Sequence, residues 1–116
     1  MQKETVSLSI REIVGSPLCI ASDDGRRVHD RIAAALKEGS NVTASFLNIT
    51  ILTAAFLNAA VGQLYGSFTE KQVRAKLKVK DIQPDDLALL KRVVETARQY
   101  FKDPKQFNKA VQDLIG

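Results

Sequence analysis

Residues 41–62 read NVTASFLNITILTAAFLNAAVG, and this stretch decides the fold. Apolar residues alternate with polar ones from Val42 to Phe46, which is the period of a β-strand, and Ile49 and Ile51 extend this strand past a bend. Thr53 then offers the hydroxyl of a helix N-cap. The apolar face of the following helix consists of Leu57, Ala60, Val61 and Leu64, and Gly66 closes it. A strand leading into a helix predicts an α/β fold.

This βα unit lies in a run without charge. Residues 39–69 contain no charged residue, although 26% of the chain is charged. Burial of a central βα unit on both faces explains much of this absence. It does not explain the second stripe of the helix, which consists of Ala55, Asn58, Gly62 and Tyr65. Two interpretations stay open: a protein interface, whose centre is depleted in charge and enriched in Tyr, or a stripe covered by another helix of the same domain.

The N-terminal part continues the alternation of strand and helix. A first strand is indicated by apolar residues that alternate with serines: Val6, Leu8 and Ile10. Residues 11–22 fit either a loop or a short strand at 18–21. Asp23 or Asp24 is expected to cap a helix that Gly39 ends.

The C-terminal part adds one strand and two helices. Residues 73–79 alternate apolar and basic side chains, which predicts the clearest strand of the chain. Pro84 suits the first turn of a third helix, and Asp103-Pro104 opens a last helix in the same way. Helical crossovers between the strands favour a largely parallel sheet in one domain, residues 1–116.

Signs of catalysis are absent from the sequence. Nothing places a nucleophile beside His29, the only histidine, and no residues have metal-ligand spacing. A phosphate-binding or dinucleotide-binding glycine loop is also lacking. We therefore expect a non-enzymatic protein with no cofactor and no metal. The single cysteine, Cys19, indicates a reducing, cytoplasmic setting, and the polar interruptions of the neutral run argue against a membrane span.

A basic segment carries a second functional hypothesis. Strand alternation would place four cations on one face: Arg74, Lys76, Lys78 and Lys80. Such a face could bind nucleic acid or another anion. Alternatively, it is a solvated face near a sheet edge, where lysines prevent pairing between molecules. The segment has no interleaved aromatic residue to stack on bases, which favours the second interpretation.

The neutral run also carries a family resemblance. NVTASFLNITILTAAFLNAAVGQLYGSF, residues 41–68, and the preceding DDGRRVHDRIAAALKEGSNV, residues 23–42, resemble the STAS-like family of unknown function. By extension the chain is similar to the STAS domains of anti-sigma-factor antagonists. The resemblance implies a mixed, mostly parallel sheet of about four strands with helices chiefly on one face. It also implies docking onto a GHKL-type ATP-binding kinase or a similar protein partner.

The resemblance locates a missing phosphoacceptor. Antagonists of this kind carry a regulatory serine where a strand gives way to a helix, and alignment by Leu57 and Gly62 puts that serine at Ala55. Alanine cannot be phosphorylated, so either the protein docks constitutively or Thr53 has taken over the switch. The expected docking residues are Asn48, Thr50, Thr53, Ala55, Asn58, Gly62 and Tyr65.

Overall fold

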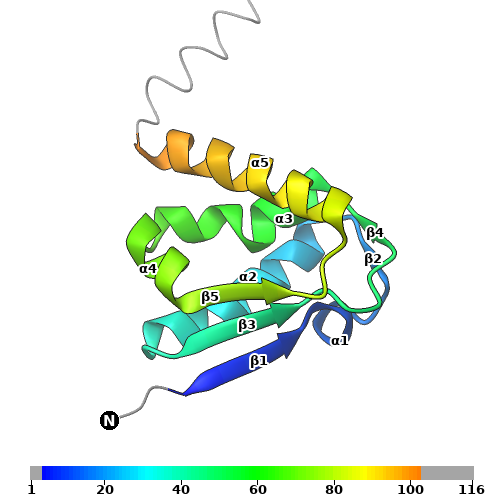
Figure 1. Cartoon of the computed structure of the whole chain (residues 1–116), viewed down its shortest axis with the longest axis horizontal. Coiled ribbons are helices and arrows are strands. Elements are labelled where there is room, and N and C mark those ends of the chain that lie inside the picture. Colours follow the sequence, from blue (N-terminus) through cyan, green and yellow to red (C-terminus); the bar gives the residue numbers. More distant parts are fainter. Residues whose placement is uncertain (1–3, 103–116) are drawn as a thin grey trace, which may run out of the picture.

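A computed structural model describes residues 4–102 of the 116-residue chain. Helices and strands alternate along it (Figure 1). Its elements are β1 (Thr5–Ser9), α1 (Ile10–Val14), β2 (Leu18–Cys19), α2 (Ser22–Lys37), β3 (Asn41–Ser45), β4 (Ile51–Leu52), α3 (Ala54–Ala60), the 3-10 helix η1 (Gly62–Gly66), α4 (Glu70–Lys76), β5 (Leu77–Lys80) and α5 (Pro84–Lys102). The helix expected at 103–116 lies outside the described residues.

The strands form two parallel sheets. β3 lies between β1 and β5 in a three-stranded sheet, while β2 and β4 pair separately. The expected α/β fold with a mostly parallel sheet is confirmed. Three of the strands form one sheet and the other two form a second, smaller sheet. Asn48 has a φ of 64°, so the chain turns sharply after β3. Ile51 therefore does not prolong β3 but starts β4 in the second sheet.

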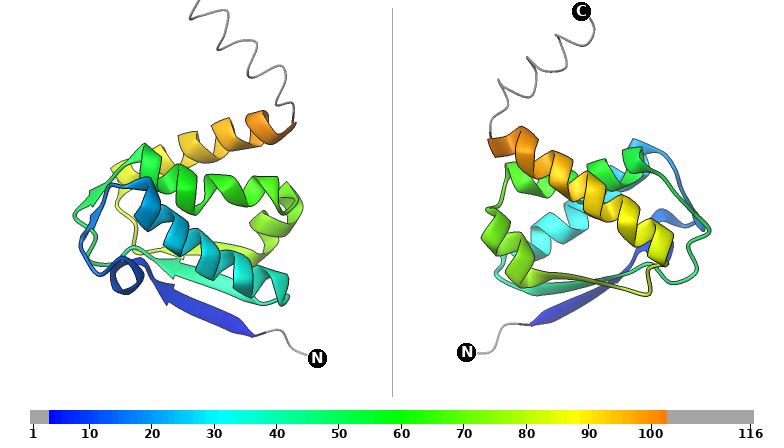
Figure 2. Two further views of the ribbon diagram at one scale, coloured as in Figure 1. Left: turned by 180° about the vertical axis from the view of Figure 1, so that it is seen from behind. Right: turned by 45° about the horizontal axis from the view of Figure 1, so that its top comes forward.

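Helices pack on one face of the three-stranded sheet. Figures 1 and 2 show α2, α3 and α5 on the same side of β1, β3 and β5, and no described helix on the other. Val6, Val42 and Leu77 stand in register on the side of the helices. The next row, Ser7, Thr43 and Lys78, points to the opposite, polar face.

A close contact at Gly25 determines how near α3 lies to α2. A Cβ atom on Gly25 of α2 would stand 2.4 Å from the Phe56 carbonyl oxygen and 2.9 Å from the Ala59 Cβ. Only glycine therefore lets the two helices approach so closely. The contact buries Phe56 and Leu57 completely, together with Val28 of α2.

Several predicted boundaries are corrected by local capping. Residues 70–76 are helical, not extended, because Thr69 and Gln72 form a reciprocal capping box and start α4. Only Leu77–Lys80 of the predicted basic strand is a strand. The predicted first strand ends at Ser9, whose hydroxyl caps α1 by accepting from the Glu12 N–H at 3.2 Å, so Ile10 is helical.

Two of the predicted helices also differ from expectation. α2 begins at Ser22 with Ala21 as its N-cap, so neither predicted aspartate is the cap; Asp23 and Asp24 lie in the first turn, where their charge suits the helix dipole. Its C-terminal end is confirmed, with Gly39 at a φ of 84°. The helix predicted from Thr53 to Gly66 is divided, because α3 ends at Ala60 and η1 follows.

Candidate docking surface

Thr53 joins the small sheet to α3. Its Oγ1 accepts a hydrogen bond from the Phe56 N–H at 3.1 Å, which confirms the predicted N-cap. The same hydroxyl donates to the Ile20 carbonyl oxygen at 2.7 Å, just beyond β2. A cap of this kind stabilises a helix by about 1 kcal/mol. Thr53 therefore fixes both where α3 begins and how the β2 segment lies against it.

An exposed apolar surface surrounds this junction. Among residues 4–102, four large hydrophobic side chains remain exposed: Leu18 (42%), Ile20 (46%), Leu47 (58%) and Ile51 (46%). Leu18 and Ile51 are register partners in the β2–β4 pair, and Leu47 follows β3. We call these four residues the apolar patch. The predicted docking residues Asn48 and Thr50 are exposed beside it in the same turn.

A second feature of this surface is the set of hollows that flank α3, one towards α2 and two towards α5. Towards α2 a hollow of about 490 Å³ is lined by Arg26, His29 and Asp30 on one side and by Ala55, Ala59 and Asn58 on the other. Towards α5 two hollows, of about 330 and 370 Å³, also meet at Asn58. We call the residues of α3 and η1 that line these hollows the α3 trough; they are Ala54, Ala55, Asn58, Ala59 and Gln63, and Asn58 lines all three hollows.

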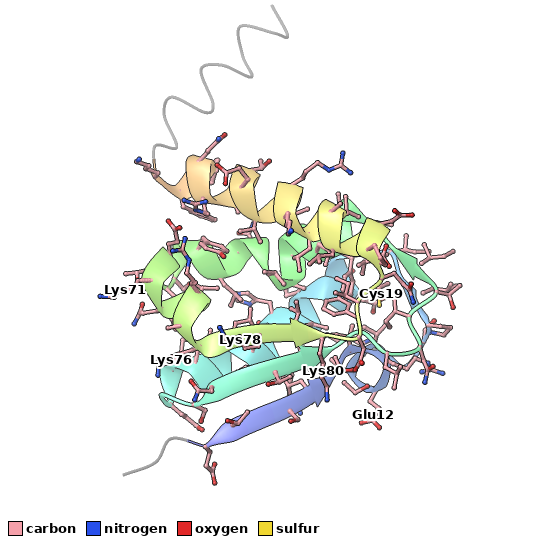
Figure 3. The ribbon with its side chains drawn as sticks, viewed as in Figure 1. Glu12, Cys19, Lys71, Lys76, Lys78 and Lys80 are labelled. Carbon is pink, nitrogen blue, oxygen red and sulfur yellow. The ribbon has the colours of Figure 1, made fainter. Side chains whose placement is uncertain are left out.

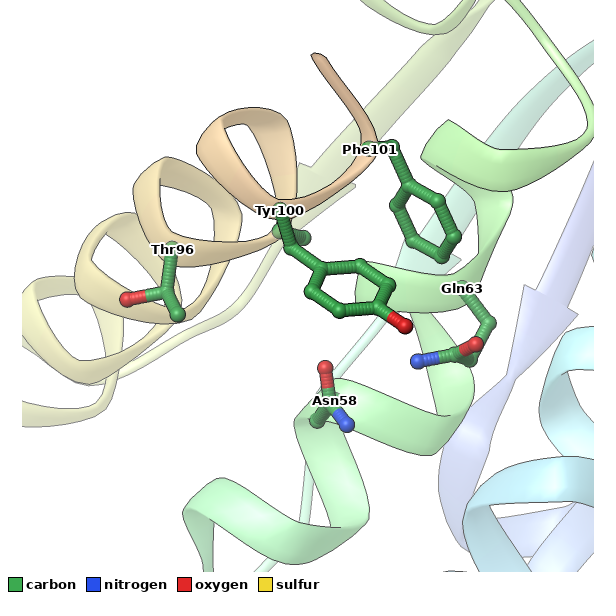
Figure 4. Close-up of a pocket in the computed structure, with 6 residues that line it drawn as sticks. Asn58, Gln63, Thr96, Tyr100 and Phe101 are labelled. Atoms are coloured by element: carbon green, nitrogen blue, oxygen red, sulfur yellow. The ribbon is translucent and has the colours of Figure 1, made fainter. Parts of the chain in front are cut away.

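The wall formed by α5 carries aromatic side chains at its C-terminal end. Figure 4 shows Tyr100 reaching from α5 towards Asn58 and Gln63, with Phe101 beside it. The Tyr100 and Phe101 rings meet edge to face, with centroids 4.9 Å apart. The trough is thus bounded by long side chains and floored by short ones.

Only part of the predicted stripe lies in the trough. Ala55 and Asn58 are exposed there, as expected for a surface available to a partner. Gly62 is buried instead, and a Cβ atom on it would stand 2.5 Å from Asn58 Oδ1 and 3.5 Å from the Ala97 Cβ of α5, so at this position the stripe is covered by another helix of the same domain. The 3-10 geometry of η1 changes the angular step per residue, so spacings of three and four no longer define one face after Ala60.

Tyr65 faces a different hollow, so its predicted place beside Ala55 and Asn58 is also wrong. This hollow of about 260 Å³ lies between α4, β5 and α5. At its rim Glu70 Oε1 accepts from Arg74 Nη2 at 2.6 Å and contacts Arg98 Nη2 at 2.9 Å. Burial, with a smaller contribution from the Glu70 carboxylate, raises the pKa of the Tyr65 phenol. The Arg98–Glu70 ion pair connects α5 to α4, whereas the Arg74–Glu70 pair lies within α4.

The four predicted basic residues do not share a strand face. Arg74 and Lys76 belong to α4, and Lys76 Nζ donates to the Gly39 carbonyl oxygen at 3.2 Å. Lys78 and Lys80 are exposed on β5, an edge strand of the three-stranded sheet (Figure 3). The placement of all four cations on one strand face is therefore wrong, because the first two are helical. Lysines on an edge strand protect it from pairing with other molecules.

The possible catalytic residues lack a reactive arrangement. His29 Nδ1 lies 3.3 Å from Asp30 Oδ1. Cys19 has no exposed surface, and burial, assisted by the Asp24 carboxylate, raises the pKa of its thiol to about 11. A thiol of such pKa is protonated at neutral pH, and only the thiolate is nucleophilic. Within residues 4–102, no group of three or more His, Cys, Asp or Glu side chains could hold a metal ion.

The sequence from α2 to the first turn of α5 identifies the family. Residues 24–87, more than half of the chain, match the family described as a STAS-like domain of unknown function. The chain belongs to this family. The matched part of this STAS-like domain contains the α3 trough and two residues of the apolar patch, Leu47 and Ile51. No curated protein and no solved structure gives a significant match. None of the helices within residues 4–102 is both long and apolar enough to cross a membrane.

Proposed function

We propose that this STAS-like domain is a non-enzymatic regulatory module that docks onto a GHKL-type ATP-binding kinase or a similar protein. The apolar patch carries the proposal. Leu18, Ile20, Leu47 and Ile51 are the large hydrophobic residues left exposed among those described, and the pairing of β2 with β4 places Leu18 beside Ile51. Clustered apolar side chains of this kind mark interaction sites on soluble proteins.

The expected gain from covering the patch is sufficient for recognition. Complete burial of a Leu or Ile side chain contributes about 1.5–3 kcal/mol. Each patch residue already buries roughly half of its surface, so each has about 1 kcal/mol still to gain. The turn around Asn48 and Thr50 is uncharged. It offers backbone and side-chain polar groups to a partner, and docking there would not remove water from a charged group.

We further propose that docking does not depend on phosphorylation of the junction. Ala55 is exposed but has no hydroxyl. The Thr53 hydroxyl is engaged as both acceptor and donor, and a phosphate on it would end its donation to Ile20. Ser45 Oγ similarly donates to Asp81 Oδ2 at 2.8 Å. Incubation with candidate kinases and ATP, followed by phosphosite mapping, should give no label at Thr53, Thr50 or Ser45.

The docking test compares variants inside and outside the patch. Leu47→Lys and Ile51→Lys should each weaken binding to a purified GHKL-type ATP-binding domain about tenfold or more, because they place a charge in the buried centre of an interface. Isothermal titration calorimetry measures the affinity, and circular dichroism checks the fold. Ala34→Lys, on an exposed position of α2, is the matched control and should bind like the wild type. Equal binding by all four proteins would contradict the proposal.

Anion or nucleic-acid binding has less support as a second function. Arg74, Lys76, Lys78 and Lys80 are divided between a helix and an edge strand, and Lys76 and Lys78 donate to backbone carbonyls. A salt-dependent retardation of DNA or RNA at low ionic strength would restore this alternative.

A further inference from the structure

We propose that the α3 trough receives an acidic helical segment of the partner, whose carboxylates bind Arg26 and Arg92 on either side of Asn58. The inference rests on the proposed docking function and names the chemistry of the partner at one part of the surface. It follows from the shape of the trough, from two arginines that have no partner within the described residues 4–102, and from the position of Asn58.

The floor of the trough suits the close approach of a helix. Ala54 and Ala55 are exposed and Ala59 is half-buried, so methyl groups form the surface along α3. Short side chains allow helix axes to approach to about 8 Å, the lower end of the usual range. The wall residues of α5 run from Leu89 to Tyr100, a length of about 16 Å at 1.5 Å per residue. Three turns of a partner helix would fill this length.

The two arginines on the walls differ from their neighbours in having no partner in the part of the chain that the structure describes. Arg27 donates to Asp24 and to the Val14 carbonyl oxygen, and Arg98 pairs with Glu70 and Glu95. Arg26 and Arg92 are exposed, and within residues 4–102 neither makes a hydrogen bond or an ion pair. Their guanidinium groups are therefore available to an external acceptor.

Charge and geometry together favour a carboxylate at Asn58. Arg26 lines the hollow on the α2 side of Asn58, and Arg92 lines a hollow on the α5 side. One other charged residue, Asp30, lines these hollows, and its carboxylate lies beside His29. The two arginines and Asp30 together give the walls one net positive charge. Guanidinium groups bind carboxylates through charge-assisted hydrogen bonds, which are the stronger kind.

Asn58 can complete such a site. Its Oδ1 lies against Gly62, where any side chain would collide with it, so buried Gly62 makes room for the amide. The amide group also carries two N–H donors. A carboxylate above Asn58 could thus accept from the amide and from an arginine of either wall. An acidic helix would present such groups at intervals of three or four residues.

The experiment titrates the full chain with two model peptides. Each is helical and about 15 residues long, with alanine and leucine on one face; one carries glutamates beside that face and the other lysines. We expect the glutamate peptide alone to shift the amide NMR signals of Ala54, Ala55 and Asn58. Arg26→Glu and Arg92→Glu should each weaken its binding about tenfold.

Matched controls come from the same helices. Arg31→Glu on α2 and Lys91→Glu on α5 change the same charge at exposed positions that do not line the trough, and should alter the affinity less than about twofold. The inference is overturned if neither peptide shifts the trough signals, if the lysine peptide binds equally well, or if the control variants weaken binding as much as the wall variants.

The outcome is separable from that of the docking test. If Leu47→Lys abolishes binding of the ATP-binding domain while the glutamate peptide leaves the trough signals unchanged, the docking function stands and only the acidic-helix inference fails. If no patch variant affects any partner, the docking function itself fails.

Discussion

The uncharged run of residues 39–69 contains two apolar regions with opposite surroundings. Phe56, Leu57 and Leu64 have no exposed surface, whereas Leu47 is 58% and Ile51 46% exposed. Both regions are equally free of charge in the sequence. The buried region lies on α3 and η1, which pack against α2 and α5, while the exposed one lies between the end of β3 and the start of β4 (Figure 1). Absence of charge in the sequence thus does not tell whether a residue is buried in the core or exposed at the surface.

The largest expected effect separates these two regions directly. Phe56→Ala should lower the free energy of unfolding by about 4 kcal/mol, because it leaves a cavity in the core. Ile51→Ala, in the apolar patch, should lower it by less than about 1 kcal/mol. Urea denaturation of both variants measures the difference. Similar losses would mean that the patch is part of the core and not a docking surface.

A second prediction concerns the contact that seats α3. Gly25→Ala should lower the free energy of unfolding by about 3 kcal/mol, because its Cβ would collide with the Phe56 carbonyl oxygen and the Ala59 Cβ, which cannot move independently of α3. Alanine is otherwise the better helix former by about 1 kcal/mol. An increase in the urea concentration at the unfolding midpoint would contradict this prediction, because it would show that α3 lies further from α2 than in the structure. Ala34→Gly on the same helix is the control, with a loss of only about 1 kcal/mol.

The third prediction uses alternation within β2, where Leu18 is exposed and Cys19 is buried. The pKa of the Cys19 thiol is raised from 9.0 to about 11 in the folded state, so between these values only the unfolded chain releases its proton. Stability should therefore fall as pH rises from 9 to 11, by about 2 kcal/mol from this group. Chemical denaturation at pH 8 and pH 11 should show a steeper loss for the wild type than for Cys19→Ala. Equal losses of stability in the wild type and in Cys19→Ala would contradict the prediction and would mean that the Cys19 thiol is in contact with solvent.

Local signals in the sequence predicted several boundaries correctly. Thr53 caps α3, Gly39 adopts the left-handed conformation after α2, and Pro84 begins α5. Each of these depends on the chemistry of one residue and its immediate neighbours. Residues 73–76 misled the prediction, because apolar and basic residues alternate there, while the capping box at Thr69 and Gln72 just before them starts a helix. The capping box was visible in the sequence and could have given the helix.

The exposure of several neutral residues agrees with the surface that we propose for docking. Asn48, Thr50, Ala55 and Asn58 were chosen for their neutrality and are exposed, and Ala55 and Asn58 line the same hollow. Leu18 and Ile20 were missed, because the pairing of β2 with β4 brings together residues more than thirty positions apart. Their apolar character gave no signal of exposure.

The sequence by itself determined the family, the α/β class and the neutral strand-to-helix junction, because these follow from residue types and spacings along the chain. Tertiary structure alone decided which neutral residues are core and which are surface. That division depends on the close seating of α3 against Gly25 and on the separation of β2 and β4 from the main sheet. Both arise from contacts between distant segments, and burial is a property of such contacts rather than of any single stretch of sequence.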